Sequence, residues 1–293
     1  MQYEGIVYRP PSEANSLIIQ ASIGCAHNRC KFCNMFREKR FRLRKVEDIK
    51  KDIDWVRAEY PAELVESIFL ADGNTILMRT PQLVEVLEYA YRSFPYLKRV
   101  TCYGASQYLA RKSAADFQAL RQAGLTRIHC GMESGYDPLL AQVKKGATQE
   151  VHIEGGQKVR QAGIELSMYY MPGLGGLDMW EDHARASAYV LNQVEPEFIR
   201  LRTFIPIAGT EIADDYQAGK FTLMNPLEVI REIRLLVENL EVRSLFLSDH
   251  WVNFVNLRGQ LPQDKRRLLA EADAALKQPP VAFREIGMTY GTL

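Results

Sequence analysis

The stretches RQAGLTRIHCGME, at residues 121–133, and RQAGIELSMYYMP, at residues 160–172, share the order of their parts. Each places an Ala-Gly helix stop before an apolar run. Their offset is about the length of one helix, its glycine stop, a strand and the loops. This repeat favours a parallel barrel or a doubly wound α/β sheet. Helices in any α/β protein can end with Ala-Gly before a strand, so the repeat alone does not decide between the two.

Short apolar runs recur along the chain on both sides of this repeat, each followed by a longer amphipathic stretch typical of a helix. Their intervals suit βα units, in which parallel strands alternate with helices. The sequence therefore predicts six strands. The runs cover residues 17–23, 67–71, 98–103, 126–132, 164–171 and 198–205.

The pattern changes after residue 206. Asn225, Pro226 and Glu228 have the order of an N-cap, a first-turn proline and an acidic third residue, which predicts the start of a helix. Apolar residues then recur on one helical face. They are Ile230, Ile233, Val237 and Leu240.

Two further segments complete this part of the chain. A second helix is predicted over residues 264–277, and SLFLSDHWVNFVNL, at residues 244–257, predicts one more strand and a loop. No flexible linker precedes these segments. We therefore expect residues 207–293 to pack on the same core as residues 1–206.

The composition is that of an ordinary globular protein. The chain has 293 residues, of which 47% are hydrophobic and 25% charged, so disorder and fibrous repeats are excluded. The net charge is +1, and the charges are interspersed without a long basic run. A nucleic-acid or anionic-membrane partner would need a local basic patch, so we expect neither partner.

Membrane and secretion signals are not predicted. The longest nearly uncharged stretch, Leu166 to Leu177, is well short of the roughly 20 residues that span a bilayer. The N-terminal segment MQYEGIVYRPP has no basic region followed by an apolar one, unlike a secretory signal. We expect a cytoplasmic protein.

Three of the five cysteines lie close together. Cys25, Cys30 and Cys33 form C-x4-C-x2-C directly after the first apolar run, which places them on a loop at the C-terminal end of a strand. Three thiolates on a four-iron cluster leave one iron without a protein ligand, open to a substrate or cofactor. The alternatives are a structural zinc site, with His27 or a distant residue as fourth ligand, or three unligated buried thiols.

These residues resemble the motif of the radical S-adenosylmethionine (SAM) enzymes, C-x3-C-x2-C with an aromatic residue just before the last cysteine. Phe32 has that position here, although the first gap is one residue longer. The resemblance spans about residues 17–206. It implies a partial (β/α)6 parallel barrel over residues 1–206, with residues 207–293 as a mostly helical extension that closes the substrate cavity. It also implies an oxygen-sensitive [4Fe–4S] cluster on the three cysteines, and SAM as a second cofactor.

The resemblance continues in the segments that contact SAM in this family. Ala71-Asp72-Gly73-Asn74 stands where the family has a Gly-Gly-Glu-Pro-like segment that contacts the methionine amino group, although a plain Asp-Gly turn would read the same way. The resemblance implies that Asp72, Gly73 and Asn74 contact SAM.

Two later segments also match the family. GMESGYDPLLAQVKKGAT, at residues 131–148, is similar to the fourth strand and helix of methylthiotransferases and oxygen-independent coproporphyrinogen oxidases. Glu133 corresponds there to a polar residue that contacts SAM. MYYMPGLGG, at residues 168–176, looks like the fifth strand and its glycine-rich exit near the adenine, which implies SAM contacts from Met168 and Gly173.

Side-chain alternation indicates which residues face the barrel interior. In FIRLRTFI, at residues 198–205, Arg200 and Arg202 share the face opposite the apolar one. Buried arginines need partners, and the candidates are the SAM carboxylate, a substrate carboxylate or interior acids such as Glu133. A structural ion pair is the alternative. The same alternation places Cys130 on the opposite face of its strand from Glu133, against helices.

The function implied by the resemblance is radical chemistry on a small molecule. The reduced cluster gives one electron to SAM, which yields methionine and a 5′-deoxyadenosyl radical that removes a hydrogen atom from the substrate. The electron donor would be a protein such as flavodoxin or ferredoxin. Alternatives are an RNA-modifying radical SAM enzyme and an iron–sulfur electron carrier or sensor without turnover. Cys102 and Cys130 are too few and too scattered for a second cluster, which disfavours sulfur insertion.

The segment SDHWVNFVNLRG, at residues 248–259, is expected to lie at the substrate end of the cavity. If it is helical, His250 and Asn253 face the same side. With Arg202, they are the candidate catalytic residues. The alternative is a packed, hydrogen-bonded layer. The sequence leaves open the substrate, the reaction after hydrogen abstraction, whether SAM is consumed or regenerated, and the oligomeric state.

Overall fold

The computed structural model describes residues 3–284, 288 and 289. These fall into two compact units. The first unit comprises Met1–Asn28, Phe36–Cys130 and Gly155–Leu166, and the second comprises Arg29–Met35, Gly131–Glu154 and Ser167–Leu293.

The first unit is built on parallel strands that lie side by side in chain order: β1 (Leu17–Gln20), β4 (Ser67–Ala71), β5 (Arg99–Tyr103) and β6 (Leu125–Glu133), whose last residues belong to the second unit. Their apolar runs are buried on both faces, as parallel strands covered by helices must be. The strand predictions for residues 67–71, 98–103 and 126–132 are confirmed, the first with the ends that were predicted and the other two with ends shifted by one residue.

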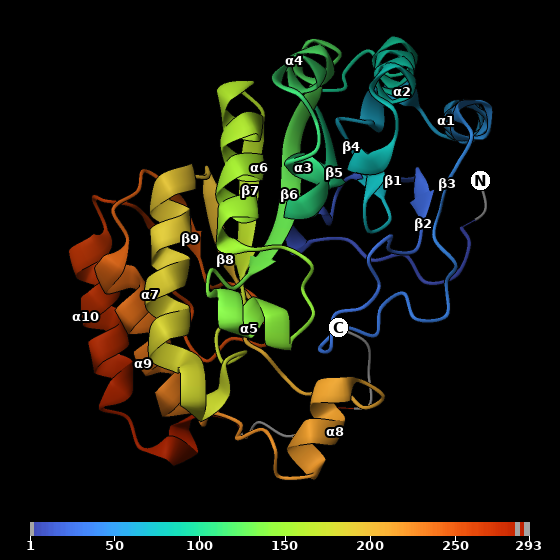
Figure 1. Cartoon of the computed structure of the whole chain (residues 1–293). Helices are drawn as coiled ribbons and strands as arrows, with labels where there is room; N and C mark the ends of the chain where they lie inside the picture. The colour runs from blue at the N-terminus through green and yellow to red at the C-terminus, as the bar shows by residue number, and fades with distance from the viewer. Residues whose placement is uncertain (1–2, 285–287, 290–293) are drawn as a thin grey trace. The chain divides into compact units, whose positions relative to one another are not determined.

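Helices cover the strands of the first unit. Figure 1 shows α1, α2 and α4 in a row, and α1 and α4 each contact α2. Ser113 and Asp116 form a capping box that starts α4. The helices are α1 (Val46–Glu59), α2 (Thr80–Ser93), α3 (Ser106–Leu109), α4 (Ala114–Gln122) and the end of α6 (Gln149–Gln161), and the 3-10 turns are Pro11–Glu13, Ala62–Leu64 and Thr75–Leu77.

The first predicted strand is shorter than expected. It breaks after β1, because the amide of Ala21 bonds to Ala71 O while Ala21 O accepts from the amide of Arg44. Residues Ser22–Ile23 then form β2, which pairs antiparallel with β3 (Arg42–Leu43) in a separate two-stranded sheet. The predicted strand over 17–23 was therefore wrong in its second half.

The second unit continues the same α/β pattern. Strands β7 (Glu165–Tyr170, which starts in the first unit), β8 (Phe198–Leu201) and β9 (Leu245–Leu247) are parallel neighbours, and β10 (Arg258–Gln260) pairs antiparallel with β9. Helix α9 (Pro226–Asn239) contacts both α7 (Gly176–Val194) and α10 (Lys265–Leu276), as Figure 1 shows. The remaining elements are α5 (Asp137–Gln142), α8 (Glu211–Gln217) and the 3-10 turn Pro280–Ala282.

The C-terminal helices begin where the sequence predicts. Asn225 accepts a hydrogen bond from the amide of Glu228, whose side chain accepts from the amide of Asn225 in turn, so α9 starts with a capping box at Pro226. Helix α10 lies within the predicted range. Strand β8 is shorter than the predicted 198–205 and ends at Leu201, because the amide of Thr203 turns to the Asn253 side chain.

The α/β class with a mostly parallel arrangement of strands is confirmed. The division of the chain at residue 206 and the closing of a cavity by the C-terminal part stay predictions. Over the described residues, every helix is too short or too polar to cross a bilayer. The cytoplasmic location also stays a prediction.

Candidate functional site

All five cysteines are thiols, but their surroundings differ. Cys25, Cys30 and Cys33 are partly exposed, whereas Cys102 and Cys130 are buried. Burial raises the pKa of Cys102 to about 12, which disfavours the thiolate that a metal requires. As predicted, Cys130 packs against a helix: its sulfur lies 3.1 Å from Ser106 Oγ at the start of α3.

The turn before Cys25 is fixed by a buried carboxylate. Gly24 adopts φ +72°, and its amide donates to Asp72 Oδ2 over 3.0 Å. The same oxygen accepts from Gln20 Nε2 at 3.1 Å and from Lys39 Nζ at 3.2 Å. Asp72 is fully buried, and all three hydrogen bonds to its Oδ2 come from groups of this chain. Its observed contacts hold the start of the cysteine loop.

The neighbouring residues of the Asp72 segment lie beside Cys25, within the first unit. Asn74 Nδ2 donates to Cys25 Sγ over 3.5 Å, while Asn74 Oδ1 accepts from the amide of Ala105. A Cβ at Gly73 would lie 3.1 Å from Cys25 Cβ, so only glycine fits there without displacement. Asp72, Gly73 and Asn74 are thus brought to the first cysteine, and their contact with SAM stays a prediction.

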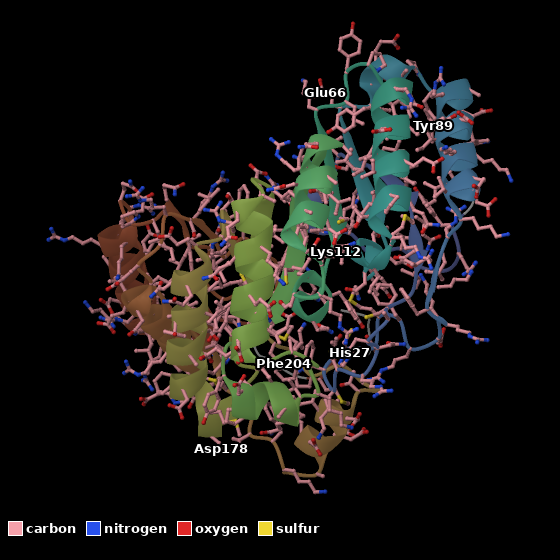
Figure 2. All side chains as sticks on the ribbon, turned by 45° about the horizontal axis from the view of Figure 1, so that its top comes forward. His27, Glu66, Tyr89, Lys112, Asp178 and Phe204 are labelled. Atoms are coloured by element: carbon pink, nitrogen blue, oxygen red, sulfur yellow. The ribbon has the colours of Figure 1, made fainter. Side chains whose placement is uncertain are left out.

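The second half of the loop is anchored in the second unit. The amide of Lys31 bonds to Val143 O, and Lys31 O accepts from the amide of Ile212, so its backbone is held by the end of α5 and the start of α8. Phe32 is buried in an apolar cluster. Phe204 of this cluster, labelled in Figure 2, packs edge-on against Phe221. The cluster also includes Leu139, Val143, Met171, Leu174 and Ile212, with Cys30 and Cys33 packed against it.

His27, the alternative zinc ligand, is half-buried on the same loop (Figure 2). Within the described part of the chain, no three His, Cys, Asp or Glu side chains are grouped as around a single metal ion. The three partly exposed thiols are soft donors that suit an iron–sulfur cluster, and a side-chain amide N–H already points at one of the sulfurs.

Glu133, at the end of β6, is held in a strained conformation with φ +66°. Its carboxylate pairs with Lys145 Nζ at 3.2 Å, with both side chains mostly buried. A Cβ at Gly131 would lie 2.2 Å from Glu133 Oε1, so the carboxylate occupies the space above that glycine. Lys145 also lies 5.8 Å from the ring centre of Phe32. Lys145 was not predicted from the sequence, where its only signal is the lysine pair in the matched segment.

A fully buried polar network supports the backbone of Glu133. His183 of α7 donates from Nε2 to Glu133 O over 3.1 Å, and its Nδ1 lies 3.1 Å from Glu232 Oε1 of α9. Glu232 also accepts from Tyr170 Oη and, over 3.0 Å, from the amide of Gly173. Burial first, and then the Glu232 charge, raise the pKa of Tyr170 well above its ordinary value. No single sequence motif points to this network.

The glycine-rich exit has the expected backbone form. Gly173 adopts φ +85°, and Gly176, at the start of α7, adopts φ +59°. Met168 on β7 is buried. The structure thus places Gly173 in the network around Glu232 and Met168 in the core, and their SAM contacts stay predictions.

The two arginines of β8 and its extension have separate surroundings. Arg200 Nη1 lies 3.5 Å from Asp249 Oδ1, so an acid of the C-terminal part faces it, while Glu133 pairs with Lys145. Arg200 Nε is buried and has no hydrogen-bond partner among the residues that the structure describes. The positive charge of Arg202 acts on His250 and disfavours its protonation.

The loop that carries His250 and Asn253 follows β9 as predicted, but it is not helical, so the condition under which the two side chains would face the same side is not met. Residues 248–257 form turns, and the amide of Asn253 bonds to His250 O. The Asn253 side chain accepts from the amide and Oγ1 of Thr203 at 2.8 and 3.0 Å and donates to Leu201 O at 2.9 Å. The cause is local, because the side-chain amide of Asn253 hydrogen-bonds to three groups at and just after the end of β8. These bonds fix a turn. A catalytic role for either residue stays a prediction.

We expect Asp72→Ala to lower the free energy of unfolding by about 3 kcal/mol, because it leaves the mostly buried Lys39 ammonium unpaired and frees the amide of Gly24. Urea denaturation of the cluster-free protein measures this. The matched control is Asp48→Ala, since Asp48 pairs with Lys51 on the surface, where loss of the pair should leave the free energy of unfolding nearly unchanged. Equal effects of the two substitutions would show that Asp72 does not hold the loop.

His250 gives a pH dependence of known sign. Burial, followed by the charge of Arg202, lowers its pKa from 6.5 to about 4. Between these values the unfolded chain binds a proton at this residue that the folded chain does not, so its contribution to stability falls as the pH falls. We expect His250→Gln to make the free energy of unfolding less dependent on pH between 6.5 and 4, measured by urea denaturation. An unchanged slope would contradict the lowered pKa.

Comparison with known proteins defines the family. Residues 19–186, more than half of the chain, match the model of the radical SAM superfamily. The chain therefore belongs to the radical SAM superfamily, and it is an enzyme of the class whose cofactors are a [4Fe–4S] cluster and SAM.

Individual relatives are more distant. The chain is 26% identical over 119 residues to a tRNA uridine(34) acetyltransferase of Methanocaldococcus jannaschii, covering 40% of this chain and 22% of that protein. It is 21% identical over 179 residues to mouse Elongator complex protein 3, covering 61% and 31%. The crystal structure of methylornithine synthase (PylB) aligns with a TM-score of 0.53 at 19% identity, covering 88% and 68%, which shows a shared fold. The chain spans under a third of both curated relatives.

Proposed function

We propose that this chain is a radical SAM enzyme that acts on a nucleoside within RNA, with Cys25, Cys30 and Cys33 as the protein ligands of the cluster. The observation that carries the chemistry is the contrast among the cysteines: three partly exposed thiols on one loop, against two buried ones. When bound, the cluster and SAM supply reductive cleavage of SAM and a radical able to remove a hydrogen atom from substrate.

The protein's own residues fix the site that these cofactors need. Asp72 holds the amide of Gly24, so the loop leaves β2 in one conformation before Cys25. Asn74 directs an N–H group to Cys25 Sγ, and hydrogen bonds to sulfur tune the potential of a cluster. Lys145 and the backbone contact from His183 hold Glu133 in one position, ready to receive the cationic groups of SAM.

A basic segment supports RNA as the substrate. Residues 36–45 read FREKRFRLRK, with six basic side chains and one acidic. Lys39 and Arg44 pair inward with Asp72 and Asp52, which anchors the segment. The net charge of +1 is a sum over the whole chain and does not reveal this segment. The interpretation that the chain has no basic run was therefore wrong. The exposed members are Arg37, Arg40, Arg42 and Lys45, of which Arg42 is paired with Glu4.

The names of the relatives support the same substrate class. The relatives include a tRNA uridine(34) acetyltransferase, and the region matched in it is only 22% of its length. Exposed arginines and lysines suit phosphates, the groups that give most of the affinity for RNA. We therefore propose RNA as the substrate in place of the small molecule that the net charge favoured.

A small carboxylic acid is the second candidate substrate. Its support is Arg200, whose Nε is buried without a hydrogen-bond partner among the described residues and whose Nη1 is 3.5 Å from Asp249. A guanidinium with unused donors suits a carboxylate. An electron carrier without turnover is the third candidate, and SAM cleavage by the protein would exclude it. A flavodoxin or ferredoxin is the proposed electron donor.

The test uses anaerobically reconstituted protein with dithionite and SAM, and 5′-deoxyadenosine is measured with total tRNA, with a panel of small carboxylic acids, and with neither. We expect tRNA to stimulate 5′-deoxyadenosine formation and to yield a modified nucleoside after digestion. Stimulation by an acid and not by tRNA would replace the RNA proposal with the second candidate. Absence of SAM cleavage by protein with a full cluster would leave the electron-carrier function.

A further inference from the structure

An exposed tryptophan lies on the loop that follows β9. Trp251 has 76% of its surface exposed, more than any other aromatic residue among the exposed large side chains of the described chain. It lies at the carboxyl end of a parallel strand, which is the edge where α/β barrel enzymes place their substrates. A tryptophan ring offers a large, flat and rigid surface on which another ring can stack.

The tryptophan has a cation and a second ring beside it. The Arg284 guanidinium carbon lies 5.2 Å from the centre of the Trp251 ring and 5.6 Å from that of Phe254. The His250 ring lies 5.9 Å from Trp251 at an angle of 32°. We call Trp251, His250 and Arg284 the aromatic platform. It combines flat rings with a cation held over them. The rings can stack on the face of a base, and the cation can attract the neighbouring phosphate.

The loop that carries the platform is fixed by hydrogen bonds at several points. Asn253 ties it to Leu201 O and to Thr203, and Ser248 bonds through its amide to Leu257 O at 2.7 Å and through Oγ to Val255 O at 2.8 Å. Arg284 donates to Val252 O. A held ring loses little conformational entropy when a ligand stacks on it.

The charges around the platform are mostly positive. Arg284 lies over the rings, Arg202 acts electrostatically on His250, and Arg200 faces Asp249. Among the described residues, Asp249 is the acid whose charge acts on His250, and it also faces Arg200. His250 is neutral near pH 7, so it can stack without adding a charge.

We propose that the aromatic platform binds an unpaired nucleobase of a single-stranded RNA segment, by stacking on Trp251 with Arg284 near the adjoining phosphate. The proposal rests on the proposed function and locates part of its substrate site. Stacking on aromatic side chains tolerates any base, because every base has a π-face. We therefore expect the platform to contribute affinity for single-stranded RNA rather than choice of base.

The test measures binding of in vitro transcribed tRNA and of an oligouridylate to reconstituted protein by fluorescence anisotropy. We expect Trp251→Ala to weaken both by about 5- to 100-fold, the range of one stacked base, and Trp251→Phe to restore most of the affinity. Trp55→Ala is the matched control, because Trp55 is a half-exposed tryptophan of α1 packed on Tyr60. SAM binding should be unchanged in all three variants.

A second measurement follows the ring itself. In the variant Trp55→Phe/Trp180→Phe, Trp251 is the only tryptophan, and saturable quenching of its fluorescence by the oligouridylate is expected. Wild-type affinity for RNA in Trp251→Ala, or RNA binding without quenching, would overturn the platform and leave the proposed function intact. Protein that binds no RNA at all would overturn both.

Discussion

Replacing any one of Cys25, Cys30 and Cys33 by alanine is expected to abolish the visible iron–sulfur absorption of the anaerobically reconstituted protein and its SAM cleavage. Two thiolates do not hold a four-iron cluster, and the remaining cysteines are buried in the core, where the pKa of Cys102 is raised to about 12. The measurements are the absorption spectrum, the iron content and the yield of 5′-deoxyadenosine.

The matched control for the cysteine variants is Cys102→Ala, which removes a thiol from the core without touching the loop. It should keep the full absorption and the cleavage activity. Full cluster absorption in Cys33→Ala would contradict the assignment of three ligands. Stoichiometric zinc with no iron after anaerobic purification of the wild type would favour the structural zinc site.

The second large effect concerns Glu133. Glu133→Gln is expected to weaken SAM binding by about tenfold or more, since hydrogen bonds to charged groups contribute roughly 1.5 to 3 kcal/mol. Lys145→Met should weaken it as well, because it removes the ion pair that holds the Glu133 carboxylate in one position. Equilibrium dialysis of SAM against reconstituted protein measures both variants.

Lys144→Met is the matched control for Lys145→Met. The two lysines are adjacent, but Lys144 is half-exposed and pairs with Glu211 instead of Glu133. SAM affinity should therefore be unchanged in the control. If Glu133→Gln and Lys145→Met both bind SAM as tightly as the wild type, Glu133 does not belong to the SAM site.

Local sequence patterns predicted the elements that local interactions determine. The strand over 67–71 was predicted with the ends it has, because its apolar residues are buried on both faces and the run is complete in itself. The start of α9 was also predicted, since its capping box is formed by Asn225 and Glu228 alone. The ends of β1 and β8 depend on bonds from Ala21 to Ala71 and from Thr203 to Asn253, which no local pattern contains.

The candidate site was predicted in part for the same reason. The three cysteines and Glu133 stand in motifs that can be read along the chain. The partners of Glu133 cannot: Lys145 comes from beyond α5 and His183 from α7, and only folding selects them. The basic segment 36–45 was readable, but averaging the charge over the whole chain concealed it.

The central claim is that three cysteines hold a four-iron cluster with one iron open to SAM. Mössbauer spectroscopy of protein reconstituted with ⁵⁷Fe, recorded with and without SAM, tests it most directly. We predict that one iron of the four changes its signal when SAM is added and that the other three do not, because cysteine thiolates already complete their coordination. Four irons that are all unchanged by SAM would contradict the account.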